Sequence, residues 1–492
     1  MTQALTSKMG ALWIQPEGPN TESYYLDCKD LGDIGIPEGA MTLIRCFRAD
    51  GSGWDTVGST QAPPEAVTFD VTGLMFNSRD WLEKVKCPFS MYALQRNCGR
   101  ADNFSNYVRG FGFHNVRRTN RSYSGIVSRE EDTQSSFSVS LEAYPPVYEI
   151  EELTIGSIVS AATENLNDVV MNADYFCYGD CGDTEPSCEL GMIAGDSAVG
   201  PALADILQTT DAGITWTQVA ANPFAAGLDA KAVATYLVGS GTRRYLVARE
   251  GTGAAVQGLV AYTDDNGATW TTASVGGAAE GHGAVRGGGL FALDERHIWL
   301  ASAAGYIYFS SDGGETWAAQ EEGAIGVTDY NQVHFEPSGQ YGIAGSAADV
   351  IIVSSNGGET WTAATATGGG GDILCCQRLD HLRAWVGDDD GNLWYTRDGG
   401  VTWTQRTGWV GSGIGDVTDL HFVNDHIAFM LHNTAAPVGT VLYTFDGGYT
   451  WIPLTTPTNV GLNAVYACDA SQALVVGKNN AGAAVILRVT AV

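Results

Sequence analysis

Three groups of residues in this 492-residue chain have types that could bind a metal ion. The first is a cluster of cysteines, Cys177, Cys181 and Cys188, in a polar segment that contains glycine. Thiolates bind zinc, but a structural zinc site of this kind normally needs a second C-x-x-C pair, which the segment lacks. The cluster could instead hold one disulfide, or its thiols could remain free.

The other two groups are an acidic run and a pair of histidines. Asp388, Asp389 and Asp390 lie in GDDDGN, which resembles half of a calcium loop but lacks the rest of the twelve-residue ligand spacing. We expect a turn between strands there. His421, Asp425 and His426 lack the H-E-x-x-H spacing of zinc proteases, so we propose no metal at any of them.

Catalytic and cofactor motifs are missing as well. The glycine runs RGGGLF and GGGGD have no strand–loop–helix setting and no following lysine, so they do not predict phosphate binding. The sequence therefore predicts no catalytic residue, no cofactor and no metal.

A different feature recurs six times, namely an eight-residue segment that ends in tryptophan. SSDGGETW, residues 310–317, is matched by TTDAGITW, TDDNGATW, SSNGGETW, TRDGGVTW and TFDGGYTW. The carboxylate can accept hydrogen bonds from its own turn, the second glycine position tolerates positive φ, and the tryptophan can be buried. We therefore predict a structural role for Asp211, Gly213, Trp216, Asp265, Gly267, Trp270, Asp312, Gly314, Trp317, Asn356, Gly358, Trp361, Asp398, Gly400, Trp403, Asp446, Gly448 and Trp451.

These segments resemble the Asp-box, or bacterial neuraminidase repeat, which in its families joins the third and fourth strands of a propeller blade. Their tryptophans are 42 to 54 residues apart, the spacing of propeller blades. Three strands follow Trp451 without a fourth, and EELTIGSIVS, residues 151–160, reads as a strand with no box of its own. Pairing this strand with the C-terminal strands gives seven blades; six is the alternative.

Some Asp-box families are enzymes. Sialidases need an arginine triad, a nucleophilic tyrosine with a glutamate, and an N-terminal arginine motif, none of which can be placed in this sequence. Glycoside hydrolases of the xyloglucanase type also carry many such boxes, but they use two propellers, and this chain has room for one. We predict that the protein is not an enzyme.

Charge divides the chain into two domains. The whole chain has 26 basic and 56 acidic residues. Residues 1–150 are nearly balanced at net −4, which leaves net −26 for residues 151–492. An acidic surface disfavours nonspecific binding to nucleic acid or to an anionic membrane. The N-terminus lacks the pattern of a signal peptide.

Residues 1–150 have β-like alternation in AMTLIRCF, EAVTFDVTG and SFSVSLEAY, with a short helix expected near SRDWLEKVKC. The polar stretch 115–136 carries Arg117, Arg118 and Arg121 and then Glu130, Glu131 and Asp132. We expect this stretch to be a mobile arm, to lie on a partner subunit, or to be a solvated loop. The predicted fold is therefore all-β, with a β-sandwich or barrel-like N-terminal domain followed by a seven-bladed propeller.

In its β-rich pattern, single helix and polar arm, the N-terminal domain is similar to tail tube proteins of tailed bacteriophages. That resemblance implies a structural virion protein in the tail, synthesised in the host cytoplasm. Residues 1–150 would form a homo-oligomer and contact other tail proteins, and the acidic propeller would decorate the outer surface. The alternative is a binding module that recognises a surface glycan or a protein, with neither membrane nor sequence-specific nucleic acid as partner.

Overall fold

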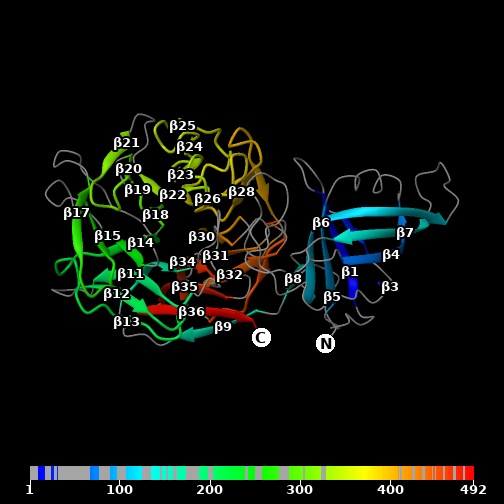
Figure 1. Cartoon of the computed structure of the whole chain (residues 1–492), viewed down its shortest axis with the longest axis horizontal. Coiled ribbons are helices and arrows are strands. Elements are labelled where there is room, and N and C mark those ends of the chain that lie inside the picture. Colours follow the sequence, from blue (N-terminus) through cyan, green and yellow to red (C-terminus); the bar gives the residue numbers. More distant parts are fainter. Residues whose placement is uncertain are drawn as a thin grey trace, which may run out of the picture. The chain divides into compact units, whose positions relative to one another are not determined.

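Figure 1 draws the protein as a computed structural model. In the N-terminal part it describes the residues of eight strands, β1 (Met9–Pro16), β2 (Tyr24–Leu26), β3 (Asp30–Leu31), β4 (Val67–Phe76), β5 (Phe89–Arg96), β6 (Tyr107–Ser124), β7 (Gln134–Ala143) and β8 (Val147–Ile150). From 153 to 491 it describes all residues except 159–161, 163, 173–187, 198–202, 239–241, 250–257, 276–287, 303–304, 323–328, 408, 410–412, 424–426, 435–437, 446, 449, 458–459, 469–471 and 480–481.

The eight N-terminal strands form one sheet in the order β2-β1-β5-β6-β7-β4-β3, with β8 paired to β6. EAVTFDVTG and SFSVSLEAY correspond to β4 and β7, which pair antiparallel along their whole length. AMTLIRCF, the expected helix and residues Glu130, Glu131 and Asp132 lie outside the described residues. The sandwich or barrel-like arrangement stays a prediction.

The expectation of a mobile arm or a solvated loop is wrong for the described residues of the polar stretch, 115–124 and 134–136, which lie in strands; contact with a partner subunit stays a prediction. Residues 115–124 belong to β6, where Arg117 pairs with Glu142 and Arg121 with Val139 of β7. A segment with few apolar side chains to bury can still form a strand, because a strand is held first by backbone hydrogen bonds to its neighbours.

The predicted seven-bladed propeller is confirmed. Each blade is a four-stranded antiparallel sheet, and in blades 1 to 6 the order of the strands across the sheet follows the order along the chain. Blades 1 to 4 are β10 (Leu166–Met171), β11 (Gly191–Ser197), β12 (Ala204–Thr209), β13 (Thr217–Gln218); β14 (Ala230–Val238), β15 (Thr242–Arg249), β16 (Gly258–Thr263), β17 (Thr271–Val275); β18 (Leu290–Asp294), β19 (His297–Ser302), β20 (Tyr306–Ser310), β21 (Ala318–Glu322); and β22 (Tyr330–Phe335), β23 (Gly342–Ser346), β24 (Ile351–Ser354), β25 (Thr362–Ala363).

The last three blades continue the ring. They comprise β26 (Ile373–Arg378), β27 (Ala384–Asp388), β28 (Leu393–Thr396), β29 (Thr404–Arg406); β30 (Asp416–Phe422), β31 (Ala428–Thr434), β32 (Val438–Thr444), β33 (Ile452–Pro453); and β34 (Val460–Ala467), β35 (Gln472–Asn479), β36 (Ala484–Ala491) with β9 (Leu153–Ile158). Blade 7 therefore combines the two ends of the propeller, because β9 pairs antiparallel with β36 from Leu153–Ala491 to Ile158–Ile486.

The hydrophobic core lies between the blades. One cluster joins blades 7 and 1, and it includes Leu166, Trp216, Leu474 and Ile486. Another joins blades 5 and 6 around Trp385, Phe422, Met430 and Trp451. Because each sheet is covered on both faces by its neighbours, the strands are nearly continuous apolar runs, and the polar residues within them need hydrogen-bond partners.

Candidate functional site

The innermost strands carry a repeated irregularity. In six blades the first strand has a bulge near its start, so that one residue is skipped in the pairing with the second strand. The skipped residues are Asn167, Lys231, Asn331, Leu374, Thr418 and Asn463. A bulge re-aims a side chain away from the regular alternation of the strand. Most of these side chains reach the next blade.

Four skipped residues donate a hydrogen bond to a backbone carbonyl of the following blade. The donor–acceptor distances are 2.8 Å from Asn167 to Ala230, 2.7 Å from Asn331 to Ile373, 2.9 Å from Thr418 to Leu462 and 2.6 Å from Asn463 to Leu166. The carbonyl acceptor lies at the equivalent position each time, immediately before the bulge of the next strand. The last of these bonds links blade 7 back to blade 1.

The residue after the bulge accepts a hydrogen bond from the next blade. The carboxylate of Asp168 accepts one from the N–H of Val233 at 2.9 Å, and the carboxylate of Asp419 accepts one from the N–H of Val465 at 2.8 Å. Gln332 accepts in the same way from the N–H of Cys376. Two residues further on, Gln377 accepts from Phe422, His421 from Ala467 and His334 from Arg378. We call these two rows of bonds the inter-blade ladder.

Burial shifts the pKa values of the charged members of the ladder in opposite directions. It raises the pKa of Asp168 and of Asp419 to about 7, and the charge of Asp168 adds to the shift at Asp419. It lowers the pKa of His334 to about 3 and of His421 to about 4. Both histidines accept a backbone hydrogen bond at Nδ1, which requires that nitrogen to be unprotonated. The ladder thus keeps its histidines neutral.

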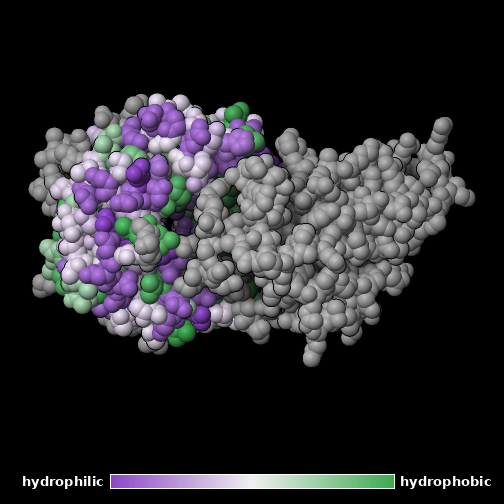
Figure 2. Space-filling model, in the orientation of Figure 1, coloured by the Kyte–Doolittle hydropathy of each residue, from purple (hydrophilic) through white to green (hydrophobic). Residues whose placement is uncertain are grey.

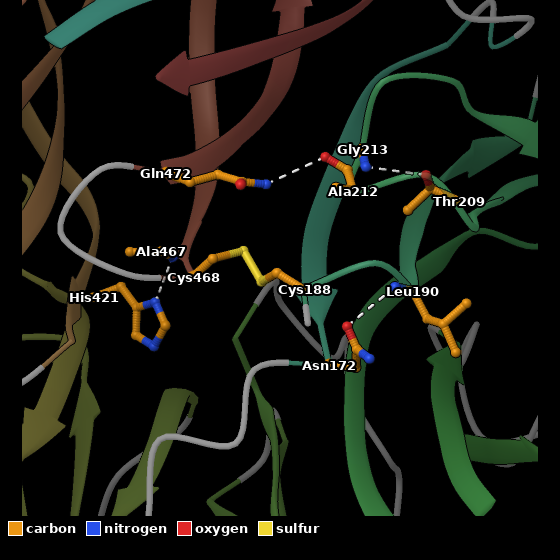
Figure 3. The surroundings of a disulfide bond; sticks show 10 residues. All are labelled: Asn172, Cys188, Leu190, Thr209, Ala212, Gly213, His421, Ala467, Cys468 and Gln472. Atoms are coloured by element: carbon orange, nitrogen blue, oxygen red, sulfur yellow. Dashed lines mark hydrogen bonds between the residues drawn. A yellow bond between two sulfur atoms is a disulfide. The ribbon is translucent and has the colours of Figure 1, made fainter. Parts of the chain in front are cut away.

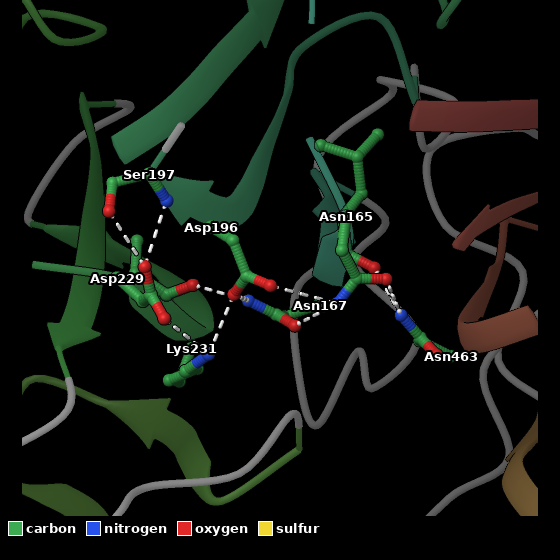
Figure 4. A network of polar contacts seen from close by, with 9 residues as sticks. Asn165, Asn167, Asp196, Ser197, Asp229, Lys231 and Asn463 are labelled. Atoms are coloured by element: carbon green, nitrogen blue, oxygen red, sulfur yellow. Dashed lines mark hydrogen bonds and ion pairs between the residues drawn. The ribbon is translucent and has the colours of Figure 1, made fainter. Parts of the chain in front are cut away.

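One cation joins the ladder to the loops at blades 1 and 2. The ammonium of Lys231 lies 2.6 Å from Asp196 and 2.9 Å from Asp229 (Figure 4). Asp196 also accepts a hydrogen bond from Asn167, and Asp229 accepts two from Ser197. Because the acids already have donors, this network is a built connection between blades rather than an open site.

The acidic run in GDDDGN forms a turn, as predicted. Asp388 accepts hydrogen bonds from the backbone of Asp390 and Asn392, and so closes the connection between β27 and β28. Asp389 and Asp390 are exposed, and Asp372 and Asp416 are half-buried beside them. Partial burial, followed by the charges of its acidic neighbours, raises the pKa of Asp389. We call Asp372, Asp389, Asp390 and Asp416 the acidic loops; they belong to blades 5 and 6.

The six boxes lie at the turns between the third and fourth strands. In the box of blade 3, Asp312 accepts hydrogen bonds from the backbone N–H of Thr316 at 2.9 Å and from the hydroxyl of Ser310 at 2.8 Å. Asp211, Asp265 and Asp398 repeat this arrangement, and Asn356 accepts from the N–H of Thr360 at 3.0 Å. The hydroxyl of Thr269, then its backbone N–H, lowers the pKa of Asp265 to about 2. Asp446 lies outside the described residues.

The second glycine of each box touches the preceding blade. Gly448 has a φ of 81°, and a Cβ there would lie 2.6 Å from the ring of Trp385 in blade 5. The same close approach recurs at Gly213, Gly267, Gly314 and Gly358. A Cβ cannot be added at these positions without moving a side chain of the neighbouring blade.

The box tryptophans contribute to the core between blades. Trp216, Trp361 and Trp451 are buried, whereas Trp270, Trp317 and Trp403 are partly exposed. The indole N–H of Trp216, Trp270 and Trp317 donates to the carbonyl of the box glycine three residues earlier. The neighbouring blade also binds one box directly, because Arg244 of blade 2 donates to the carbonyl of Gly313 at 3.1 Å.

One disulfide joins the adjacent blades 7 and 1, and its second cysteine was not predicted from the sequence. Cys188, from the connection between β10 and β11, forms a disulfide with Cys468, which directly follows β34 (Figure 3). Cys177 and Cys181 lie outside the described residues. The partner was missed because Cys468 is 280 residues away, and only the closed ring brings blade 7 next to blade 1. Cys375 and Cys376 are buried free thiols.

The described part of the chain contains neither a cluster of metal-binding residues nor a membrane-spanning helix. No group of three or more His, Cys, Asp or Glu residues there could hold a metal ion. Asp425 and His426 are outside that part, and His421 belongs to the ladder. Within the same residues, no helix has both the length and the hydropathy that a membrane span requires.

The surface of the propeller is mixed. On the face that Figure 2 shows, apolar residues form small patches among hydrophilic ones. Exposed large apolar side chains of the described residues include Ile214 and Val401 in two boxes and Ile414 beside the acidic loops.

Comparison with known proteins identifies the fold. No protein-family model matches the chain, and no curated protein does. The chain is similar to the solved structure of YCF48 bound to D1 peptide, with 17% identity, a TM-score of 0.51, and coverage of 69% of this chain and 97% of that one. YCF48 from Cyanidioschyzon merolae has 16% identity, a TM-score of 0.49, and coverage of 68% and 98%. The GH74 xyloglucanase from Xanthomonas campestris has 15% identity and a TM-score of 0.45, and the match covers 67% of this chain and 54% of that one.

At such identities the likeness shows only the fold, a seven-bladed β-propeller, and says nothing about activity. The ladder was missed by sequence reasoning, although it leaves a signal. A polar residue such as Asp168, Gln332 or Asp419 interrupts an apolar run near the start of the first strand of a blade. Aligning the blades on their boxes would have brought these positions together.

Proposed function

We propose that this chain is a non-enzymatic binding protein whose propeller docks a protein partner. The observation that carries the proposal is the contrast between two sets of polar residues. Those of the ladder are bonded to the next blade, and they are therefore occupied in holding the ring together. In the acidic loops, Asp389 and Asp390 are exposed, Asp372 and Asp416 are partly buried, and Asp389 and Asp416 are repelled by neighbouring carboxylates.

The chemistry of the acidic loops favours a positively charged partner. Burial raises the pKa of Asp389 and of Asp416, and repulsion from neighbouring carboxylates raises it further. A cationic segment would relieve that repulsion. Complementary charge raises the rate of association and selects among partners. Ile414, which is exposed two residues before Asp416, offers an apolar contact to such a partner. The YCF48 propeller, similar in fold, was solved with a bound peptide, which fits a docking role.

The test is titration of the full-length protein with a fluorescent arginine-rich peptide. We expect Asp389→Asn combined with Asp390→Asn to weaken binding several-fold, since a charge at the rim of an interface contributes about 0.2 to 1 kcal/mol. The control removes two exposed acids from the boxes, Glu315→Gln with Glu359→Gln. Equal weakening in the control would mean nonspecific attraction to an acidic protein, and would contradict docking at the acidic loops.

We further propose that the protein is a structural component of a virion tail, a tail tube protein or a related one. Residues 1–150 would self-assemble, and the acidic propeller would face outward. The support is the resemblance of the N-terminal domain and the concentration of negative charge in residues 151–492. Electron microscopy of the full-length protein should show rings or tubes. Monodisperse single particles would contradict the tail proposal and leave protein docking standing.

A further inference from the structure

The contact between blades 7 and 1 is where the propeller closes, and it differs from the other contacts between blades. It contains the disulfide between Cys188 and Cys468, whose Cα atoms are 6.0 Å apart. Both cysteines are buried, at 6% and 3% exposed, within the core cluster shared by the two blades. Near the disulfide, Gln472 of blade 7 donates a hydrogen bond to the carbonyl of Ala212 in the first box (Figure 3).

This contact has a weaker ladder than its neighbours. Blade 7 carries Ala464 at the position where Asp168, Gln332 and Asp419 accept a backbone hydrogen bond from the following blade. Alanine has no side-chain acceptor, so that bond cannot form between blades 7 and 1. The skipped residue Asn463 still bonds to blade 1. Ala232 leaves the same bond out between blades 2 and 3, but among the described residues only the contact between blades 7 and 1 has a disulfide beside the missing bond.

The strand that completes blade 7 is held mainly by its backbone. Of the six residues of β9, only Leu153 is buried, whereas Thr154, Gly156 and Ser157 are exposed. Ile158 packs at the edge of the cluster between blades 7 and 1. An outer strand with little buried side-chain area contributes few of the apolar contacts that would resist its separation.

The order of these elements along the chain makes the disulfide and the pairing of β9 with β36 two independent ways of closing the ring. The disulfide closes a covalent loop from 188 to 468, which contains every strand from β11 to β34. β9, at 153–158, lies outside that loop, and so does its partner β36. Separation of β9 from β36 therefore leaves the covalent loop intact, whereas separation of the blades requires the disulfide to break.

We propose that the disulfide and β9 form a redox-dependent double latch on the propeller. With the disulfide formed, β9 can leave β36 without the ring opening. With the two thiols reduced, the pairing of β9 with β36 is the strand pairing that still ties the two ends of the propeller together, beside the buried cluster and the side-chain bonds between blades 7 and 1. Reduction consumes two electrons and two protons from an external dithiol, which is itself oxidised to a disulfide, and it leaves two thiols at Cys188 and Cys468.

The test is a double-mutant cycle in the full-length protein. Gly156→Pro with Ser157→Pro removes two adjacent backbone N–H groups from β9, and both side chains are exposed. Cys188→Ala with Cys468→Ala removes the disulfide. Hydrogen exchange of β10 and β34 reports the opening of the ring. We expect each pair alone to change protection modestly, and the four changes together to lower it at least tenfold more than the product of the separate effects.

Two matched controls accompany the cycle. Thr271→Pro with Thr272→Pro breaks β17, which is the outer strand of blade 2 and is also exposed at those residues. Cys375→Ala with Cys376→Ala removes two buried thiols that form no crosslink. Neither control should show the coupling.

Three results would overturn the proposal. The first is a proline effect in β9 that is the same with and without the disulfide. The second is failure of the Cys188→Ala, Cys468→Ala protein to fold while β9 is unchanged. The third is failure of the β9 variant to fold while the disulfide is intact, because either element alone is proposed to suffice.

Discussion

At the scale of single residues, the ladder combines groups that respond to pH in opposite ways. The carboxyl of Asp419 has a pKa of about 7 in the folded protein against 3.8 when unperturbed, so the folded state binds its proton more tightly. The stability from this group is complete below about pH 4 and is lost as the pH rises toward 7. For His421 the folded pKa of about 4 lies below 6.5, so its stability is complete above pH 6.5 and is lost on acidification toward pH 4.

The first prediction isolates the carboxyl. Asp419→Asn keeps an oxygen that can accept from Val465 but removes the ionisation. From pH 5 to pH 8, the free energy of unfolding of the variant should rise relative to that of the wild type by about 1 to 3 kcal/mol, since one pKa unit is about 1.4 kcal/mol. Urea unfolding at both pH values measures the difference. An unchanged difference, or one like that of the exposed control Glu359→Gln, would contradict a raised pKa at Asp419.

The second prediction concerns the box carboxylates. Asp312→Ala should lower the free energy of unfolding by about 1 to 2 kcal/mol, because the N–H and hydroxyl of Thr316 lose a charged acceptor in a partly exposed turn. Asp312→Asn should cost less, since Asn356 accepts the equivalent N–H bond in the box of blade 4. Calorimetry compares the two variants. Equal losses would mean that the charge is unimportant, and a calcium-dependent rise in melting temperature in the wild type alone would indicate a metal instead.

At the scale of the elements, the boxes act as spacers between blades. Each box turn follows the third strand of its own blade, and its second glycine lies against the blade before it. The turn therefore sets a distance between two sheets, in addition to reversing the chain. This explains why a solvent-facing turn ends in a tryptophan that is buried or partly buried at all six positions.

The third prediction tests this spacing. Gly448→Ala should destabilise the propeller through backbone strain and through contact with the buried ring of Trp385. The matched control is Gly482→Ala, where φ is similar at 85° but nothing lies within 4 Å of the added Cβ. The excess cost at Gly448, measured by urea unfolding, should be about 1 to 3 kcal/mol, the usual cost of overpacking. Partial recovery on adding Trp385→Phe would attribute the excess to the ring, whereas equal costs at the two glycines would leave only backbone strain.

Sequence reasoning succeeded where the signal was local. The box is a contiguous segment, so its six copies predicted the blades, and the three unmatched strands after Trp451 predicted a seventh. The ladder and the disulfide depend on contacts between blades. Asp168 meets Val233, and Cys188 meets Cys468, only after the ring has closed. No local pattern of turn or strand residues could have paired them.

At the scale of the whole molecule, charge is distributed unevenly between the two parts of the chain. Residues 151–492 carry net −26 and residues 1–150 carry net −4. Copies of a strongly acidic unit repel one another within a Debye length of about 8 Å at physiological salt. Close packing of many copies is therefore easier through the N-terminal part. The paired strands β6 and β7 add a sheet whose polar residues include Arg117 opposite Glu142.

The last prediction follows from this distribution. A fragment ending near Tyr148 should still form large assemblies, whereas residues 151–492 should be a monomer, because nearly all the net negative charge lies in the propeller. Light scattering of the two fragments and of the full chain measures their masses. Raising the salt concentration is the control, since it screens repulsion between propellers without adding an assembly surface. The contrary result would be a propeller fragment that assembles at low salt beside a monomeric fragment of residues 1–148. The N-terminal part could then not be the assembly domain. The virion-tail proposal would give way to a propeller that binds its partner and its own copies through one surface.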